Sequence, residues 1–140
     1  MSLNEQGIAG EKMAREWLLD KYRYNLKNLT QIDWLIKDIN GDWFCVEVKN
    51  KKRFKGSKYY SDKPKYNTFE GHGLDLRQFN YRMDLWSDKD IPCLFLIFEP
   101  DTKYIYYQWL SVLKDKDNHL ITKNNIIIFD IKDFNCETRK

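Results

Sequence analysis

The first apolar pattern along the chain has the spacing of a helix. Between positions 4 and 22, one stripe recurs at intervals of three and four residues, at Glu11, Ala14, Leu18 and Tyr22. This spacing predicts an amphipathic helix with Glu11 at the edge of, or within, its buried face. A surface glutamate is the ordinary alternative for Glu11 taken alone.

Strand-like runs follow the predicted helix. A short strand is expected at 24–29, and two longer ones at 31–39 and 42–50 flank the dipeptide Asn40-Gly41, a strong hairpin signal. Both longer runs are apolar on both faces, which indicates strands in a central sheet that is covered on both sides.

The second half of the chain is expected to contain a long loop, a second helix and further strands. Residues 51–73 have no clean periodicity, so we expect a long connection there, a basic loop over 50–73. A second helix is predicted at 74–86, where Leu74, Gln78, Tyr81 and Leu85 share one face. Strands at 93–98, 104–108 and 126–131, a helical turn near 109–113 and a loose tail after Phe134 complete the prediction. The fold class expected is one α/β domain over 1–140, with a central mixed sheet flanked by helices, in the order α-β-β-β-α-β-β with a late strand.

Composition agrees with a single packed domain. Of the 140 residues, 42% are hydrophobic and 16% aromatic, and no apolar run is long enough to span a bilayer. No secretion signal is recognisable at the N-terminus. Cys45, Cys93 and Cys136 are widely spaced and odd in number, which favours reduced thiols and a cytoplasmic location without membrane association.

Charge is concentrated in one segment. Eight basic residues and one acid, Asp62, give residues 49–66 a charge of +7, and since the chain carries +3 the remainder carries −4. The segment also contains aromatic residues, a combination that suits binding along a nucleic-acid backbone. A solvated lysine-rich loop is the alternative from composition alone.

Candidate chemistry lies on the predicted hairpin. Glu47 and Lys49 are two residues apart in a strand and therefore point to one face, and Asp33 begins the preceding strand. A two-residue turn would pair Trp34 with Glu47 and place Asp33 on the opposite face. A shared site therefore requires a longer loop or a bulge.

Such a set of acids suits a divalent metal. Mg²⁺ prefers hard oxygen ligands and takes one or two carboxylates, and bound metal ions can activate water for phosphodiester hydrolysis. Asp33, Glu47 and Glu11 are candidate ligands, with the Val48 carbonyl as a further one. Lys49 would lie beside the metal, where a cation can lower the pKa of bound water or stabilise developing charge. Mg²⁺ is the expected cofactor, with Mn²⁺ as a substitute.

The ordered set of Glu11, Asp33 and Glu47-Val48-Lys49 resembles the PD-(D/E)XK nuclease superfamily, over roughly residues 7–98. The resemblance implies a restriction-endonuclease-like fold, and the small single-domain form is most similar to Holliday-junction resolvases and to phage or mobile-element nucleases. It also implies that Gln78, on the helix after the hairpin, orients the attacking water, with Tyr81 as its companion.

A metal-dependent DNA endonuclease is therefore the function expected, with junction-like structures among its candidate substrates. A homodimer is one expected arrangement, because cutting two strands calls for two sites. The alternatives are a DNA-binding module of the same fold without catalysis, and a nuclease that acts on RNA. The residues expected to contact nucleic acid are basic: Lys51, Lys52, Arg53, Lys55, Lys58, Lys63, Lys65, Arg77 and Arg82. His72 is interpreted as a helix-entry loop residue, with a role as general base or phosphate contact as the alternative.

Overall fold

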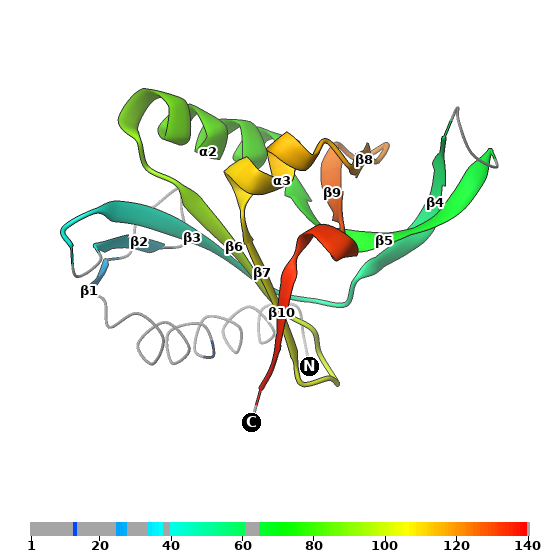
Figure 1. The fold of residues 1–140 in the computed structure, drawn as a ribbon, viewed down its shortest axis with the longest axis horizontal. Coiled ribbons are helices and arrows are strands. Elements are labelled where there is room, and N and C mark those ends of the chain that lie inside the picture. The colour runs from blue at the N-terminus through cyan, green and yellow to red at the C-terminus, as the bar shows by residue number, and fades with distance from the viewer. Residues whose placement is uncertain (1–12, 14–24, 28–33, 38–39, 61–64, 140) are drawn as a thin grey trace.

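The fold is built around a mixed β-sheet (Figure 1). The computed structural model describes residues 13, 25–27, 34–37, 40–60 and 65–139. Within them, this sheet has six strands in the order β1-β2-β3-β6-β7-β10. Their bounds are Asn25–Lys27, Trp34–Lys37, Trp43–Asn50, Cys93–Phe98, Tyr104–Trp109 and Asn135–Thr138. The β3–β6 pair is parallel and the other pairs are antiparallel, so the expected mixed α/β class is confirmed.

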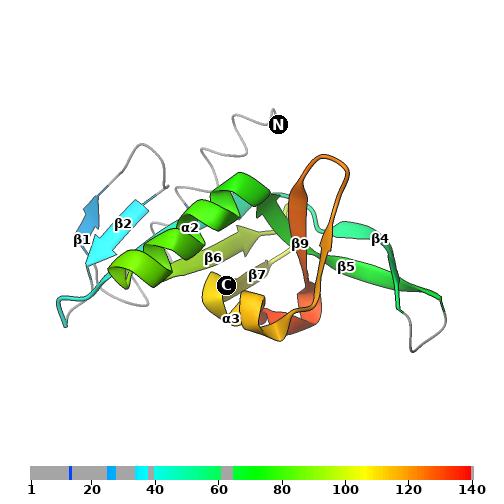
Figure 2. The same cartoon turned by 90° about the horizontal axis from the view of Figure 1, so that it is seen from above.

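Two helices cover one face of this sheet. Helix α2 (Leu76–Lys89) connects the two sheets of the fold, and α3 (Leu110–Lys116) follows β7 directly. Seen from above, both helices lie over β6 and β7 (Figure 2). Helix α2 starts two residues later than expected, because Leu74 and Asp75 belong to a strand and the Asp75 carboxylate caps the helix by accepting from the Arg77 amide at 2.8 Å.

Apolar residues pack against both faces of the central strands. On the helix side, Phe79 and Met83 of α2 and Leu110 of α3 join a buried cluster with Phe95 and Ile97. On the opposite side, a second cluster forms from Phe44, Val46, Leu94, Leu96, Phe98 and Ile105, and Met13 packs against it. All six residues of β6 are buried. The prediction of a sheet covered on both sides is therefore confirmed.

A second sheet replaces the loop expected at 50–73. Its strands, in the order β4-β5-β9-β8, are Phe54–Tyr59, Tyr66–Asp75, Ile126–Asp130 and His119–Ile121. Strands β4 and β5 form a hairpin that projects from the body of the molecule (Figure 1), and we call its residues 54–60 and 65–70 the arm. The loop prediction was wrong because β4 alternates only between exposed and half-buried positions, so it has no apolar stripe to reveal a strand.

Two glycines allow β9 to lie close against β5. A Cβ atom at Gly71 would come within 1.8 Å of the Phe129 carbonyl oxygen, and one at Gly73 within 2.1 Å of the Ile127 oxygen. Both distances are far below van der Waals contact, so a side chain at either position would force the strands apart.

The C-terminal segment is also ordered by pairing. After β9, the short 3-10 helix η1 (Ile131–Asp133) leads to buried Phe134, and β10 then pairs with β7. The expectation of a loose tail is therefore wrong. Cys45, Cys93 and Cys136 are free thiols, as expected. In the part of the chain that the structure describes, no helix is both long and apolar enough to cross a membrane.

Candidate functional site

The candidate site centres on Glu47, a carboxylate that is almost entirely removed from solvent. Its residue is 2% exposed, on the face of β3 that α2 covers. The Lys49 Nζ lies 3.0 Å from Oε1 of Glu47, and an Arg82 Nη2 donates to Oε2. Two cations thus compensate the desolvation of one buried anion. The prediction that Glu47 and Lys49 share a face is confirmed.

Arg82 is the partner that the sequence did not indicate. We expected it at the surface as a nucleic-acid contact, but it is 1% exposed and also donates to the Gln78 carbonyl at 3.1 Å. The correction follows from which face of α2 packs against the sheet, because positions 79, 82 and 83 are buried and the predicted positions 78 and 81 are exposed. Burial of a guanidinium carries a desolvation cost that an anionic partner offsets, and Glu47 is that partner.

The α2 residues that were expected near the metal lie at the protein surface. The side chains of Gln78 and Tyr81 are exposed, and Arg77 is exposed as well. The shared apolar face predicted for Leu74, Gln78 and Tyr81 is therefore wrong, since Leu74 is a buried residue of β5. Gln78 is linked to Glu47 through its backbone carbonyl and Arg82, not through its amide side chain.

A shared acidic site required a hairpin without a simple two-residue turn, and the observed register meets this condition. Trp34 pairs with Val46 and Lys37 with Trp43, so the simple two-residue turn is excluded and the irregular hairpin is confirmed. Gly41 in the connection has φ of 87°, a conformation that glycine adopts without strain. Asp33 and Glu11, the other two candidate acids, lie outside the described residues.

Of the residues expected to hold a metal, the structure describes Glu47 and Val48. The described residues contain no group of three acids, histidines or cysteines that would hold an ion together. Glu47 and the Val48 carbonyl are hard oxygen donors, the kind that Mg²⁺ prefers, so the donor chemistry fits this metal. Lys49 Nζ is on the side of Oε1, and with 35% of its side chain exposed it is the partner of Glu47 that solvent can reach.

Basic residues continue along the strand beyond Lys49. The Lys51 Nζ donates to the Gly73 carbonyl at 2.7 Å and thereby ties the end of β3 to β5. Burial, reinforced by the nearby charge of Lys49, lowers the pKa of Lys51 to about 8, although Glu47 acts in the opposite direction. Glu47, Lys49 and Lys51 are alternate residues and form one charged row along the strand.

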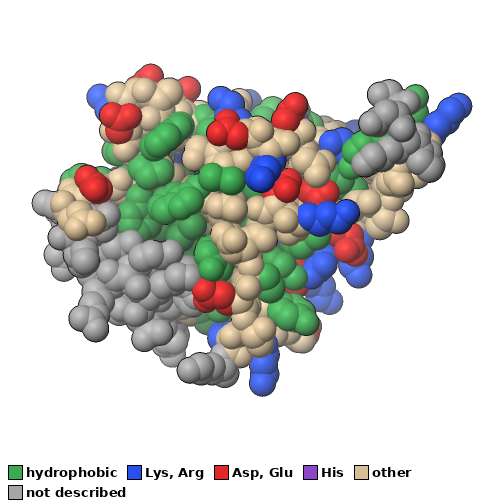
Figure 3. Space-filling view, viewed as in Figure 1, with side chains coloured by type: hydrophobic (Ala, Val, Ile, Leu, Met, Phe, Trp, Pro, Cys, Tyr) green, Lys and Arg blue, Asp and Glu red, His purple; other side chains and the backbone are tan. Residues whose placement is uncertain are grey.

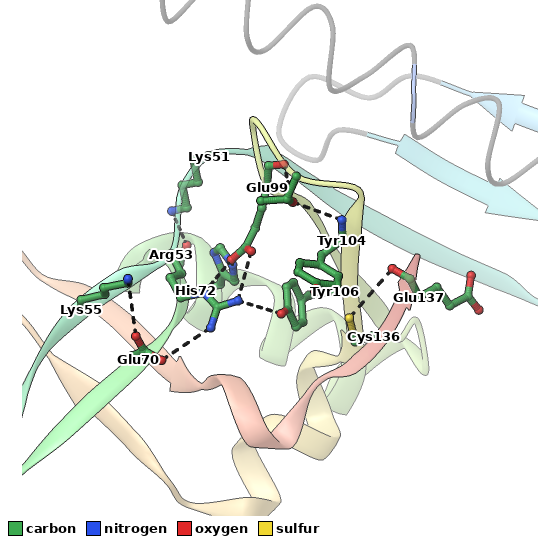
Figure 4. Close-up of polar contacts among 12 residues, drawn as sticks. Lys51, Arg53, Lys55, Glu70, His72, Glu99, Tyr104, Tyr106, Cys136 and Glu137 are labelled. Atoms are coloured by element: carbon green, nitrogen blue, oxygen red, sulfur yellow. Dashed lines mark hydrogen bonds and ion pairs between the residues drawn. The ribbon is translucent and has the colours of Figure 1, made fainter. Parts of the chain in front are cut away.

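A buried polar cluster lies at the end of this row (Figure 4). Arg53 donates through Nε to Oε2 of Glu99 at 3.0 Å and through Nη2 to the Tyr106 hydroxyl at 2.7 Å. The Nε2 of His72 lies 2.7 Å from the same Glu99 oxygen. His72 is 1% exposed on β5, so its interpretation as a loop residue is wrong, and its burial does not suit a general base. Arg53 was expected to contact nucleic acid; here it joins β5, β6 and β7.

The cluster shifts the pKa values of its members. Burial lowers the pKa of His72 to about 4, against the opposing influence of Glu99, so the neutral ring donates Nε2–H to Glu99. Burial acts to raise the pKa of Glu99, but hydrogen bonds from Arg53 and His72 outweigh it and lower the value. The hydrogen bond with Glu99 raises the pKa of Arg53. Arg53 therefore pairs with the Glu99 carboxylate inside the cluster, and Glu70 lies 3.5 Å from Nη1 of the same guanidinium at its edge.

This arrangement predicts a loss of stability in acid. Because the pKa of His72 is lower in the folded state than the ordinary value of 6.5, the unfolded chain takes up the proton first. The contribution to stability is complete above about pH 6.5 and is lost as the pH falls toward 4, by about 3 kcal/mol. Urea unfolding measured across this range should show the decrease. In His72→Gln the slope between pH 6.5 and 4 should be flatter, and an identical slope would contradict the assignment.

The remaining basic residues are spread over different surroundings. Lys52, Lys55 and Lys65 are exposed, and basic side chains gather over the base of the arm (Figure 3). Lys58 is half-buried, with its Nζ 5.1 Å from the centre of the Tyr60 ring. Lys63 lies outside the described residues. The structure thus leaves Lys52, Lys55, Lys65 and Arg77 exposed, whereas Arg53 is engaged in buried contacts and Arg82 is buried.

Comparison of the chain with models of known protein families and with curated proteins finds no match.

Proposed function

We propose that the protein is a metal-dependent DNA endonuclease with a restriction-endonuclease-like core of the PD-(D/E)XK type. The observation that carries the proposal is the ion pair of Glu47 and Lys49, 3.0 Å apart on one face of β3. An acid and a lysine in this relation are the central pair of the motif that the sequence resembles. Both residues lie on an internal strand under α2, where burial of charged groups is costly. A functional site explains why such groups are kept there.

The topology around this pair supports the same proposal. Strands β1, β2 and β3 are antiparallel neighbours, and the chain returns after α2 to place β6 parallel to β3. The resemblance implies this succession of hairpin, helix and further strand. The arm between β3 and α2 is an addition to the expected order.

Each residue has a distinct task in the proposed site. Glu47 would hold the metal, together with Asp33, Glu11 and the Val48 carbonyl. When bound, Mg²⁺ supplies activation of water and neutralises charge on the phosphate. Arg82 donates to one oxygen of Glu47 and so holds the orientation of the carboxylate. The Lys49 ammonium can leave Oε1 for an oxygen of the phosphate, where a cation stabilises the transition state.

One observation favours a second candidate, a DNA-binding module without catalysis. Both oxygens of Glu47 already have cationic partners, Lys49 and Arg82, and a closed ion pair can be purely structural. The exposed lysines would serve binding equally well in this case.

A cleavage screen distinguishes the two candidates. The protein should be incubated with Mg²⁺ or Mn²⁺ and with duplex, nicked, flap, four-way-junction and single-stranded DNA, and with single-stranded RNA. We expect at least one DNA to be cut, and the cutting to disappear with EDTA or in Glu47→Gln. DNA binding without cleavage under every condition would favour the non-catalytic module, and cleavage of RNA alone would redirect the proposal to an RNA nuclease.

A further inference from the structure

A pocket of about 510 Å³ opens beyond the end of the charged row on β3. Lys52, Arg53 and Lys55 form one side of it. The turn between β6 and β7 forms the other, with Glu99, Pro100, Thr102 and Tyr104. The volume lies in the range of pockets that hold small organic molecules. No residue of this pocket is needed for the chemistry proposed at Glu47.

The charges of the pocket suit an anionic group. Lys52 and Lys55 are exposed, and Lys55 has only a loose partner, Glu70, at 3.8 Å. The acid in the wall, Glu99, is already bound by Arg53 and by His72, so its charge is compensated within the cluster. Lys52 and Lys55 therefore face a wall whose acid does not repel a phosphate.

The opposite wall offers an aromatic surface. Tyr104 is 46% exposed, and its ring lies 6.2 Å from that of Tyr106, which Arg53 holds in place through the hydroxyl. Pro100 and Thr102 continue this wall, and the Thr102 hydroxyl fixes the start of β7 by accepting from the Tyr104 amide at 3.1 Å. An exposed aromatic ring on a rigid turn is a platform on which a base can stack.

The pocket is within reach of the candidate catalytic pair along one DNA strand. Lys52 is five positions after Glu47, so their Cα atoms are at most about 18 Å apart. That distance corresponds to roughly five nucleotides of stacked strand, and to fewer in an extended one.

From these observations we infer that the pocket holds one unstacked nucleotide of a DNA strand, with its base on Tyr104 and its phosphate near Lys52 and Lys55. The inference rests on the proposed nuclease function and adds to it a class of substrate. A nucleotide inside fully stacked duplex cannot enter such a pocket, so the bound strand has a single-stranded or extruded position near the cut. Flaps, junctions and single strands meet this condition more easily than intact duplex.

Binding without cleavage tests the inference. Affinity for a labelled oligothymidylate should be measured in EDTA by fluorescence anisotropy. Tyr104→Ala should weaken binding about tenfold, while Tyr104→Phe should bind as the wild type does, because stacking needs the ring alone. The double variant Lys52→Gln/Lys55→Gln should lower the slope of log affinity against log salt by about 1.4, since each charge neutralised on a single strand contributes about 0.7. Trp86→Ala, which removes a ring of similar exposure (42%) on α2, is the matched control and should bind as the wild type does.

An abasic scan then locates the nucleotide. One abasic position near the scissile phosphate should weaken binding by the same factor as Tyr104→Ala, and the two losses should not add. Equal affinity of Tyr104→Ala and wild type would overturn the pocket while leaving the nuclease proposal intact. Loss of cleavage in Glu47→Gln, together with the expected weaker binding of Tyr104→Ala, supports both the nuclease proposal and the pocket. If the wild type does not bind the oligothymidylate at all, the pocket assignment is wrong.

Discussion

Replacing Lys49 by alanine is expected to slow DNA cleavage by about 10²- to 10³-fold, the loss typical when one group that stabilises transition-state charge is removed. The fold should survive. Glu47 keeps Arg82 as its buried partner, and 35% of the Lys49 side chain is exposed, so the ion pair that is lost contributes little, of the order of 1 kcal/mol or less. The measurement is the single-turnover cleavage rate at saturating protein.

The control for Lys49→Ala is the removal of a different lysine, which changes the net charge by the same amount. Lys123→Ala removes an exposed cation from the turn between β8 and β9, away from the row on β3. DNA affinity of Lys49→Ala in EDTA should stay within a factor of about three of wild type, because one phosphate contact at most is lost. A cleavage rate in Lys49→Ala equal to that of Lys123→Ala would remove Lys49 from the proposed mechanism.

The variant Arg82→Met should be destabilised by about 3–5 kcal/mol, because it leaves the Glu47 carboxylate buried beside only one, partly exposed cation. Methionine keeps much of the volume of the side chain in the helix, so the loss reflects charge more than a cavity. Urea unfolding at pH 7, with comparison of the midpoint and the slope, measures the effect.

A double variant separates the charge from the packing. Glu47→Gln/Arg82→Met has neither buried charge and should recover much of the stability that the single variant loses. If Arg82→Met instead unfolds like wild type and binds DNA more weakly, Arg82 is a surface contact as the sequence suggested, and the buried ion pair has no role in stability.

The strands of the central sheet were predicted well because they are apolar on both faces. The run at 93–98 coincides with β6, and Tyr104 begins β7 as expected. The pairing of Glu47 with Lys49 also followed from the sequence, since residues two apart on a strand must share a face.

The arm and Arg82 could not be predicted from the same signal. Both faces of the arm are largely polar, Gly56 interrupts β4, and Gly71 and Gly73 interrupt the part of β5 that follows the arm, so no alternation of apolar residues marks these strands. Arg82 was missed because a charged residue on a helix is ordinarily exposed, and only the structure shows that the face it shares with Phe79 and Met83 is the buried one. Its partner lies 35 positions away, a relation that no local pattern reveals.

The arm has one further consequence for how such a protein can diversify. Its outer residues pair only with one another in the sheet register, whereas its base is held by Lys51 on Gly73 and by the Arg53–Glu99 pair. The two ends of the hairpin thus meet at a fixed junction, and the outer part can change in length or composition without altering the strands that carry Glu47. If the proposed nuclease function holds, exchange of this hairpin would be a simple evolutionary route to new substrates without a change to the strands that carry Glu47.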